Sequence, residues 1–315
     1  MKPFPLASDG QPFAGPLFAF SAFLIWGLSP IYWKALHEVG SFEIILHRIL
    51  WSFAFLMPLI GIGRQWNEFK KTVSSPKMLF ILLITALLVG GNWLLYIWAV
   101  NNGRVLQASL GYYINPLVNI VLGMLFLGER LRRAQTVAVA LATLGVFNLT
   151  FRHGVFPWVS LTLAFSFGLY GLIRKMAAVG ALVGLTVETL LLTIPAGIWI
   201  LHLHRIDAGA FLHTGHTIDL LLVGTGILTA TPLLLFNLGA KRITLASLGF
   251  IQYTAPTGML LLGVTIFDEA FTRIQAITFG LIWSALAIYS WDAARLHRKR
   301  STRATGREQY RQKRW

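Results

Sequence analysis

The sequence contains no cysteine, which excludes disulfide bonds, thiolate catalysis and thiolate metal sites. Charged residues are also scarce, at 12% of the 315 residues against 56% hydrophobic residues, and the mean hydropathy is +0.65. So few charges cannot solvate the surface of a globular protein of this size. The composition therefore argues against a soluble enzyme and favours a membrane protein.

Several functional motifs are also missing from the sequence. It has no GxxxxGK[ST] phosphate loop, and no gap between its apolar segments could house a nucleotide-binding domain, which argues against a primary pump. It has neither HExxH nor GxSxG, and no aspartate pair sits in two central apolar segments, which argues against an intramembrane enzyme. Residues 1–13 lack the order of a cleaved signal peptide, so we expect a short cytoplasmic amino-terminal segment there.

The formal charge of +15 is concentrated at the carboxyl end. The basic residues after Asp292 are Arg295, Arg298, Lys299, Arg300, Arg303, Arg307, Arg311, Lys313 and Arg314. Residues 293–315 are therefore predicted to form a basic cytoplasmic tail, either solvated or bound to anionic membrane lipids. Nucleic acid is not an expected partner.

Apolar stretches of about 18 to 24 residues, each long enough to span the bilayer as a helix, recur through residues 14–292. The predicted spans are 14–34, 43–62, 78–99, 106–127, 134–151, 156–174, 183–202, 217–239, 245–267 and 273–292. The expected fold is an all-α polytopic membrane protein with ten transmembrane helices. If the amino terminus is cytoplasmic, 21 of the 27 Lys and Arg residues fall on that side, five fall on the other, and Arg48 lies within a span. This bias predicts a multi-pass protein of the bacterial inner membrane with both termini in the cytoplasm.

The two halves of the sequence repeat. ASLG at Ala108–Gly111 recurs at Ala246–Gly249, and Gly128-Glu129 corresponds to Asp268-Glu269. Five predicted helices separate the copies, and an odd number inverts the second copy in the membrane. The sequence thus predicts a five-plus-five inverted-topology repeat, with residues 14–151 as the first half and 152–292 as the second.

Four segments resemble a known family: WGLSPIYWK at Trp26–Lys34, EIILHRILWS at Glu43–Ser52, NWLLYIWAVN at Asn92–Asn101, and ASLGYYINPL at Ala108–Leu117 followed by LGERL. Together they resemble the RarD-like branch of the EamA-type permeases in the drug/metabolite transporter superfamily. The resemblance covers nearly all of residues 14–292. It implies two inverted halves around a central cavity and transport of a small metabolite or an amphipathic, drug-like solute by alternating access.

Ionisable residues within spans are costly, so they should face a cavity or pair with one another. Glu43 and His47 are four residues apart and share a helix face, with Arg48 beside them. These three residues either bind a substrate charge or a coupling proton, or form an interfacial salt bridge that fixes their helix. Glu188 has the same two interpretations, the structural one being a pair with Arg174 or Lys175.

Prolines within three predicted spans, at Pro30, Pro116 and Pro256, free backbone carbonyls and are candidate hinges, unless they only kink the helices for packing. The amides of Asn92, Asn115 and Asn119 could give a solute directional hydrogen bonds. Aromatic residues concentrate in the same region. Trp26, Trp93, Tyr96 and Tyr112 are the candidates for a binding pocket, whereas Trp33 and Trp98 lie near predicted interfaces and are expected to be membrane anchors.

Two weaker patterns concern metal binding and helix packing. His202, His204, His213 and His216 surround one predicted outer loop, which motivates a membrane enzyme or a lipid- or metal-binding scaffold as the rival function. We predict no metal and no cofactor. Small residues at 134, 138 and 142, and at 276, 280 and 284, predict close helix packing within a monomer or across a homodimer.

Overall fold

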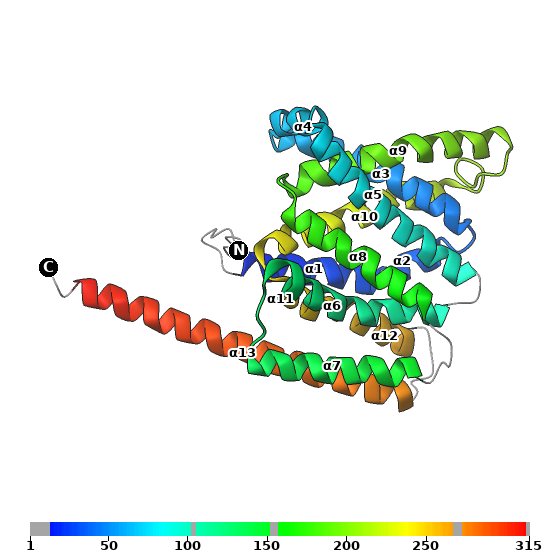
Figure 1. Ribbon diagram of the computed structural model, residues 1–315. Coiled ribbons are helices and arrows are strands. Elements are labelled where there is room, and N and C mark those ends of the chain that lie inside the picture. Colours follow the sequence, from blue (N-terminus) through cyan, green and yellow to red (C-terminus); the bar gives the residue numbers. More distant parts are fainter. Residues whose placement is uncertain (1–12, 102–104, 152–156, 267–272, 313–315) are drawn as a thin grey trace. The chain divides into compact units, whose positions relative to one another are not determined.

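The structure is a computed structural model that describes residues 13–101, 105–151, 157–266 and 273–312. All regular secondary structure in these residues is α-helical, which confirms the all-α prediction (Figure 1). The chain divides into two compact units. The first contains residues 1–129 and 156–270, and the second contains residues 130–155 and 271–315.

The helices follow the predicted apolar stretches closely. Those of the first unit are α1 (Ala14–Leu28), α2 (Pro30–Ala35), α3 (Ser41–Ile62), α4 (Trp66–Val73), α5 (Pro76–Asn101), α6 (Val105–Leu127), α8 (Trp158–Met176), α9 (Ala181–Arg205), α10 (His216–Arg242), α11 (Leu245–Gln252) and α12 (Thr254–Thr265). Those of the second unit are α7 (Arg133–Phe151) and α13 (Arg273–Gln312).

Eight segments in the described part of the chain are long and apolar enough to cross a membrane. They comprise α1 with α2, then α3, α5, α6, α9 and α10, then α11 with α12, and the first part of α13. The two other predicted spans form α7 and α8, which have 19 residues each. Helix α8 carries Arg174 and Lys175 in its last turn, which lowers its hydropathy.

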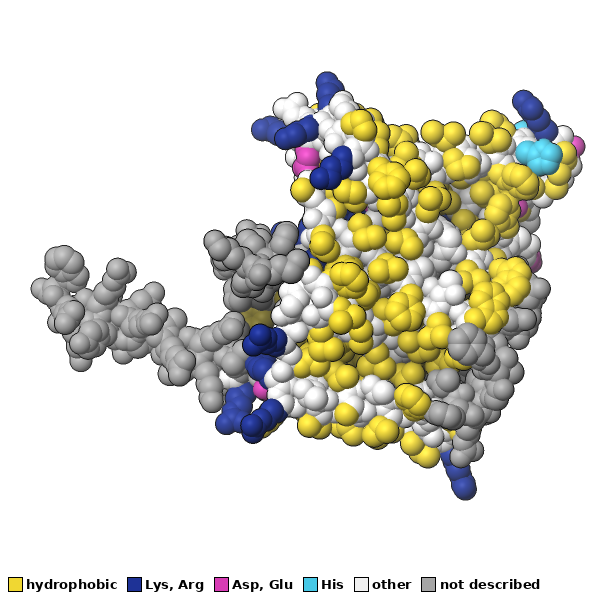
Figure 2. Space-filling view, viewed as in Figure 1, with side chains coloured by type: hydrophobic (Ala, Val, Ile, Leu, Met, Phe, Trp, Pro, Cys, Tyr) yellow, Lys and Arg dark blue, Asp and Glu magenta, His cyan; other side chains and the backbone are white. Residues whose placement is uncertain are grey.

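The exposed flank of the first unit is apolar. Large hydrophobic side chains such as Leu125, Ile198 and Leu220 are 72%, 64% and 73% exposed, and such side chains cover the middle of the visible face (Figure 2). Basic side chains gather at one end of this unit, around α4. An apolar belt with charges at its end is the surface that a bilayer requires.

Two of the spans are broken near their middle. Helix α1 ends at Leu28 and α2 begins at Pro30; between them lies Ser29, whose Oγ donates a hydrogen bond to the Trp26 carbonyl oxygen (2.8 Å). Helix α11 ends at Gln252, Tyr253 lies between it and α12, and Pro256 lies in the first turn of α12. By contrast, Pro116 lies inside the continuous helix α6.

Close helix approaches form the core of the first unit. Helix α1 packs against α10 and α12, α3 packs against α9 and α10, and α6 packs against α8 and α11. At the contact of α6 with α11, a Cβ atom added to Gly249 would lie 2.5 Å from the Pro116 carbonyl oxygen. Only glycine permits this approach.

In the second unit α7 packs along α13. Ala138 and Ala142 are buried there, as the small-residue pattern predicts. The predicted stripe of α13 does not pack within the chain, because Ala276, Gly280 and Ser284 are exposed, and its packing across a homodimer stays a prediction. The buried face of α13 carries Thr278, Ile282 and Ala285 instead.

Candidate functional site

The first unit contains a cavity of about 290 Å³. Its lining comprises Phe23, Trp26, Ser29, Pro30, Trp33, Arg48, Asn92, Trp93, Tyr96, Ala108, Gly111, Tyr112, Asn115, Leu163, Phe167, Leu228, Gln252, Ala255, Pro256 and Met259. Both helix breaks therefore border this space. The lining includes seven of the predicted binding residues and two of the predicted hinges. Glu43, His47, Asn119, Glu188 and Pro116 are not part of it.

Arg48 projects from α3 into the cavity between two indole rings. Its guanidinium carbon lies 4.8 Å from the ring centroid of Trp33 and 4.7 Å from that of Trp93. Its Nε donates a hydrogen bond to Thr229 Oγ1 on α10 (2.9 Å). Cation–π contacts of this kind stabilise a guanidinium that has lost most of its water.

Aromatic side chains form much of the remaining wall. Tyr96 and Tyr112 make an edge contact, with ring centroids 5.7 Å apart. Trp26 makes a similar contact with Phe167 at 5.7 Å, and both rings also contact Phe236. Rings held edge-on by one another give a rigid apolar surface suited to a ring-bearing or aliphatic solute.

A buried amide network joins α6 to α11 beside the cavity. Asn119 Nδ2 donates to Gln252 Oε1 (2.8 Å) and to Asn115 Oδ1 (3.2 Å). Gln252 Nε2 donates to Asn115 Oδ1, and Asn115 Nδ2 donates to the Ala164 carbonyl oxygen. Asn92 Nδ2 donates to the Leu163 carbonyl oxygen and to Ser166 Oγ, each at 2.8 Å. These amides thus hold helices together at the edge of the cavity.

Glu43 and His47 contact the loop between α9 and α10 and not the cavity. Glu43 Oε1 accepts hydrogen bonds from the backbone nitrogens of Ala210 (2.7 Å) and Phe211 (3.2 Å). His47 Nε2 lies 3.8 Å from the same oxygen, and His47 Nδ1 accepts a hydrogen bond from Trp51 Nε1 (3.1 Å). Glu43 and His47 therefore share one environment, and Arg48 is the one of the three that reaches the cavity.

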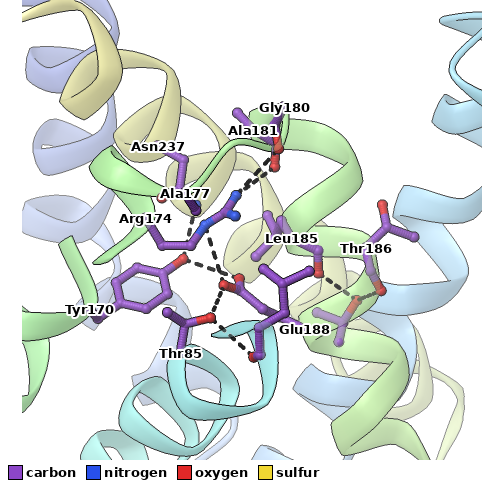
Figure 3. Close-up of polar contacts among 12 residues, drawn as sticks. Thr85, Tyr170, Arg174, Ala177, Gly180, Ala181, Leu185, Thr186, Glu188 and Asn237 are labelled. Atoms are coloured by element: carbon purple, nitrogen blue, oxygen red, sulfur yellow. Dashed lines mark hydrogen bonds and ion pairs between the residues drawn. The ribbon is translucent and has the colours of Figure 1, made fainter. Parts of the chain in front are cut away.

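Glu188 belongs to a buried polar cluster outside the cavity lining (Figure 3). Arg174 Nε lies 3.2 Å from Glu188 Oε1, which also accepts a hydrogen bond from Thr85 Oγ1 (2.6 Å). Tyr170 OH donates to Glu188 Oε2 (3.4 Å) and accepts a hydrogen bond from Asn237 Nδ2 (2.9 Å). The cluster connects α5, α8, α9 and α10. The sequence left two interpretations of Glu188 open, a functional role and a structural pair with Arg174 or Lys175. The structure contains the pair with Arg174.

Sequence reasoning missed several lining residues. Trp33 was expected to be a membrane anchor, yet it lines the cavity and covers Arg48. The anchor prediction rested on the position of Trp33 near the end of the predicted span 14–34, and this position does not determine whether the side chain faces lipid or the cavity. Gln252 was also missed, although an amide beside the Gly249 and Pro256 repeat positions is a signal that could have found it. Trp98 instead packs against Trp158 and is 39% exposed.

The histidine-rich loop does not form a metal cage in the described part of the chain. The rings of His204 and His213 lie 5.5 Å apart, and His213 Nε2 lies 4.0 Å from Asp207 Oδ1. Among the residues described, no group of three or more His, Cys, Asp or Glu side chains converges on a position for a metal ion. Metal binding therefore has no support from the geometry of this loop.

Comparisons with known proteins agree with the fold. Residues 13–151 match the EamA-like transporter family. Protein RarD of Salmonella typhi is 48% identical over 289 residues, which are 91% of this chain and 97% of that protein. An uncharacterized transporter of Vibrio cholerae is 49% identical over 278 residues, 88% of this chain and 92% of its own. A crystal structure with 22% sequence identity covers 90% of this chain and 98% of its own at a TM-score of 0.68, which shows a shared fold. The chain is therefore a multi-pass membrane protein of the EamA-like transporter family, within its RarD-like branch.

Proposed function

We propose that the chain is a secondary permease of the bacterial inner membrane that carries a small organic solute through the Arg48 cavity by alternating access. One observation carries this proposal. The cavity is lined by residues from both halves of the sequence, such as Trp93 and Phe167, and it borders the breaks at Ser29 and Tyr253. A site at discontinuous helices between two halves is typical of secondary transporters.

The proposed architecture is ten spans in two inverted halves, residues 14–151 and 152–292. The most extensively packed pairs of helices support it, because exchanging the halves converts each of them into an observed pair or into itself. Helix α6 packs on α8 as α12 packs on α1, and α1 packs on α10 as α8 packs on α5. Helices α3 and α9, α6 and α11, and α7 and α13 are corresponding helices that pack on each other.

In the proposed cycle the broken spans bend at Pro30 and Pro256, and α6 bends at Pro116. Each proline removes a backbone hydrogen-bond donor, so bending the helix at that point breaks fewer hydrogen bonds. The Glu188 and Arg174 cluster holds four helices together outside the cavity lining. In the proposed cycle these helices either move together as one rigid group or separate from one another. Protons are the coupling ion we propose for this movement.

Topology provides one test. Because the natural chain lacks cysteine, a single introduced cysteine is the only thiol that a membrane-impermeant reagent can label. With both termini in the cytoplasm, His213→Cys should be labelled on intact cells, and Lys71→Cys only after permeabilisation. The reverse pattern would overturn the proposed orientation.

Transport itself is tested in vesicles reconstituted with the purified full chain and a panel of labelled amino acids, organic acids and aromatic metabolites. We expect flux of at least one solute above protein-free vesicles. Met259→Trp fills the cavity and should reduce this flux at least about tenfold, whereas Met124→Trp, on the exposed surface of α6, should leave it unchanged. Flux that persists in Met259→Trp would contradict transport through this cavity.

A further inference from the structure

The lining of the cavity carries an unbalanced charge. Of the described residues that line it, Arg48 is the one with a permanent charge, and none is acidic. No Asp or Glu oxygen in the described part of the chain lies within 4.0 Å of an Arg48 nitrogen. A cation in hydrocarbon surroundings without a counter-ion is costly, and a solute that brings a negative charge removes this cost.

The orientation of Arg48 restricts the shape of that negative group. Trp33 and Trp93 lie against the guanidinium at 4.8 and 4.7 Å, and Thr229 Oγ1 accepts from Nε. The two terminal nitrogens remain as donors toward the cavity. Paired guanidinium N–H groups match the two oxygens of a carboxylate in one plane.

The size and polarity of the cavity restrict the rest of the solute. A volume of about 290 Å³ is small for a ligand pocket. The wall also contains rings such as Trp26, Tyr112 and Phe167, which favour an apolar or aromatic body. One arginine balances one negative charge, whereas a phosphate dianion would need further cations that the lining does not contain.

We propose that the solute is an organic monoanion, a carboxylate that binds the terminal nitrogens of Arg48 and places an aliphatic or aromatic body against the rings of the cavity. This substrate class rests on the proposed permease function and narrows it. It also assigns Trp33 and Trp93 to positioning Arg48, so that its donors point into the cavity.

Binding by the detergent-purified full chain tests the substrate class without requiring flux. The probes are matched pairs of the same shape and different charge: indole-3-acetate with indole-3-acetamide, and benzoate with benzamide. Calorimetric titration should show that the carboxylate of at least one pair binds about 10- to 100-fold more tightly than its amide. This preference should disappear in Arg48→Gln and be retained in Arg205→Gln, whose exposed side chain is outside the cavity lining.

Equal affinity for carboxylate and amide in both pairs would overturn the proposal, as would a carboxylate preference that survives Arg48→Gln. Thermal unfolding without probe shows whether Arg48→Gln is folded. If it is not, Arg48→Lys replaces it and should reduce the preference, because an ammonium lacks the planar pair of donors. Carboxylate binding through Arg48 without flux in vesicles would refute the permease function alone. Flux of neutral solutes without carboxylate preference would refute the substrate class alone.

Discussion

Arg174 and Glu188 form an ion pair with no access to solvent: the Nε to Oε1 distance is 3.2 Å, and the side chains are 0% and 1% exposed. Each is also held by hydrogen bonds, Glu188 from Thr85 and Arg174 to the carbonyl oxygen of Ala181 (3.1 Å). Removing one partner of such a pair leaves the other charge buried and unbalanced. We therefore expect the two residues to act first on stability and through it on the proposed transport.

Glu188→Gln is expected to lower the free energy of unfolding by about 3–5 kcal/mol, because Arg174 loses its counter-ion while the packing stays unchanged. Thermal or denaturant unfolding in detergent measures this loss. Replacing both residues with methionine should recover part of it, since no buried charge remains. Asp292→Asn breaks the more exposed pair with Arg132 (2.7 Å) and should cost at most about 1 kcal/mol. Unchanged stability of Glu188→Gln with lost flux would instead indicate a role in coupling.

Glu43→Gln should loosen the loop between α9 and α10, because the backbone nitrogens of Ala210 and Phe211 lose a charged acceptor. Hydrogen bonds to charged groups contribute about 1.5–3 kcal/mol, so amide exchange at residues 206–215 should accelerate about tenfold or more. Hydrogen-exchange mass spectrometry measures this rate. The exposed Glu38→Gln is the matched control and should change nothing. Wild-type exchange in Glu43→Gln would show that this carboxylate does not hold the loop.

Gly249→Ala should destabilise the contact of α6 with α11 by about 1–3 kcal/mol through overpacking, because the new methyl group would lie 2.5 Å from the Pro116 carbonyl oxygen. A lowered Tm in detergent would show it. Gly91→Ala is the control, since a Cβ at that position has no atom within 4 Å. Equal Tm values for the two variants would mean that α11 can shift away from Pro116 at little cost.

Trp33→Leu should weaken solute binding about 2- to 30-fold, because it removes one of the two rings that hold Arg48, a contact worth about 0.5–2 kcal/mol. Initial rates of flux at several solute concentrations measure the change. Trp98→Leu, outside the cavity lining, should keep the wild-type rates. A defect in Trp98→Leu that equals the defect in Trp33→Leu would favour the anchoring role that the sequence suggested for both.

Much of the fold could be predicted because hydrocarbon imposes helices of known length on apolar sequence. The predicted span 43–62 differs from α3 (Ser41–Ile62) by two residues at one end. The sequence did not predict that the helices break at Ser29 and Tyr253. A proline indicates that a helix is disturbed nearby, but it does not indicate the residue at which the helix ends. Helix α4 was missed because its eight residues are too polar and too short to give a span signal.

The candidate site could be predicted less completely than the fold. The cost of burying charge identified Glu43, Arg48 and Glu188 equally, although only Arg48 lines the cavity. The groups that satisfy the other two lie far along the chain or on a different helix. Ala210 is 167 residues from Glu43, and Thr85 is 103 residues from Glu188. Local spacing cannot reveal such pairings.

Helix α13 continues without interruption for 40 residues, from Arg273 to Gln312. At 1.5 Å per residue this is a rod about 60 Å long, twice the thickness of the hydrocarbon core. Its membrane-length segment ends at Arg295, so the remaining turns extend for about 25 Å. A tilt of about 10° in such a rod displaces its far end by about 10 Å. A small tilt of the membrane-length segment of α13 therefore produces a large displacement at the carboxyl end of the helix. A fluorophore attached near that end would report this displacement.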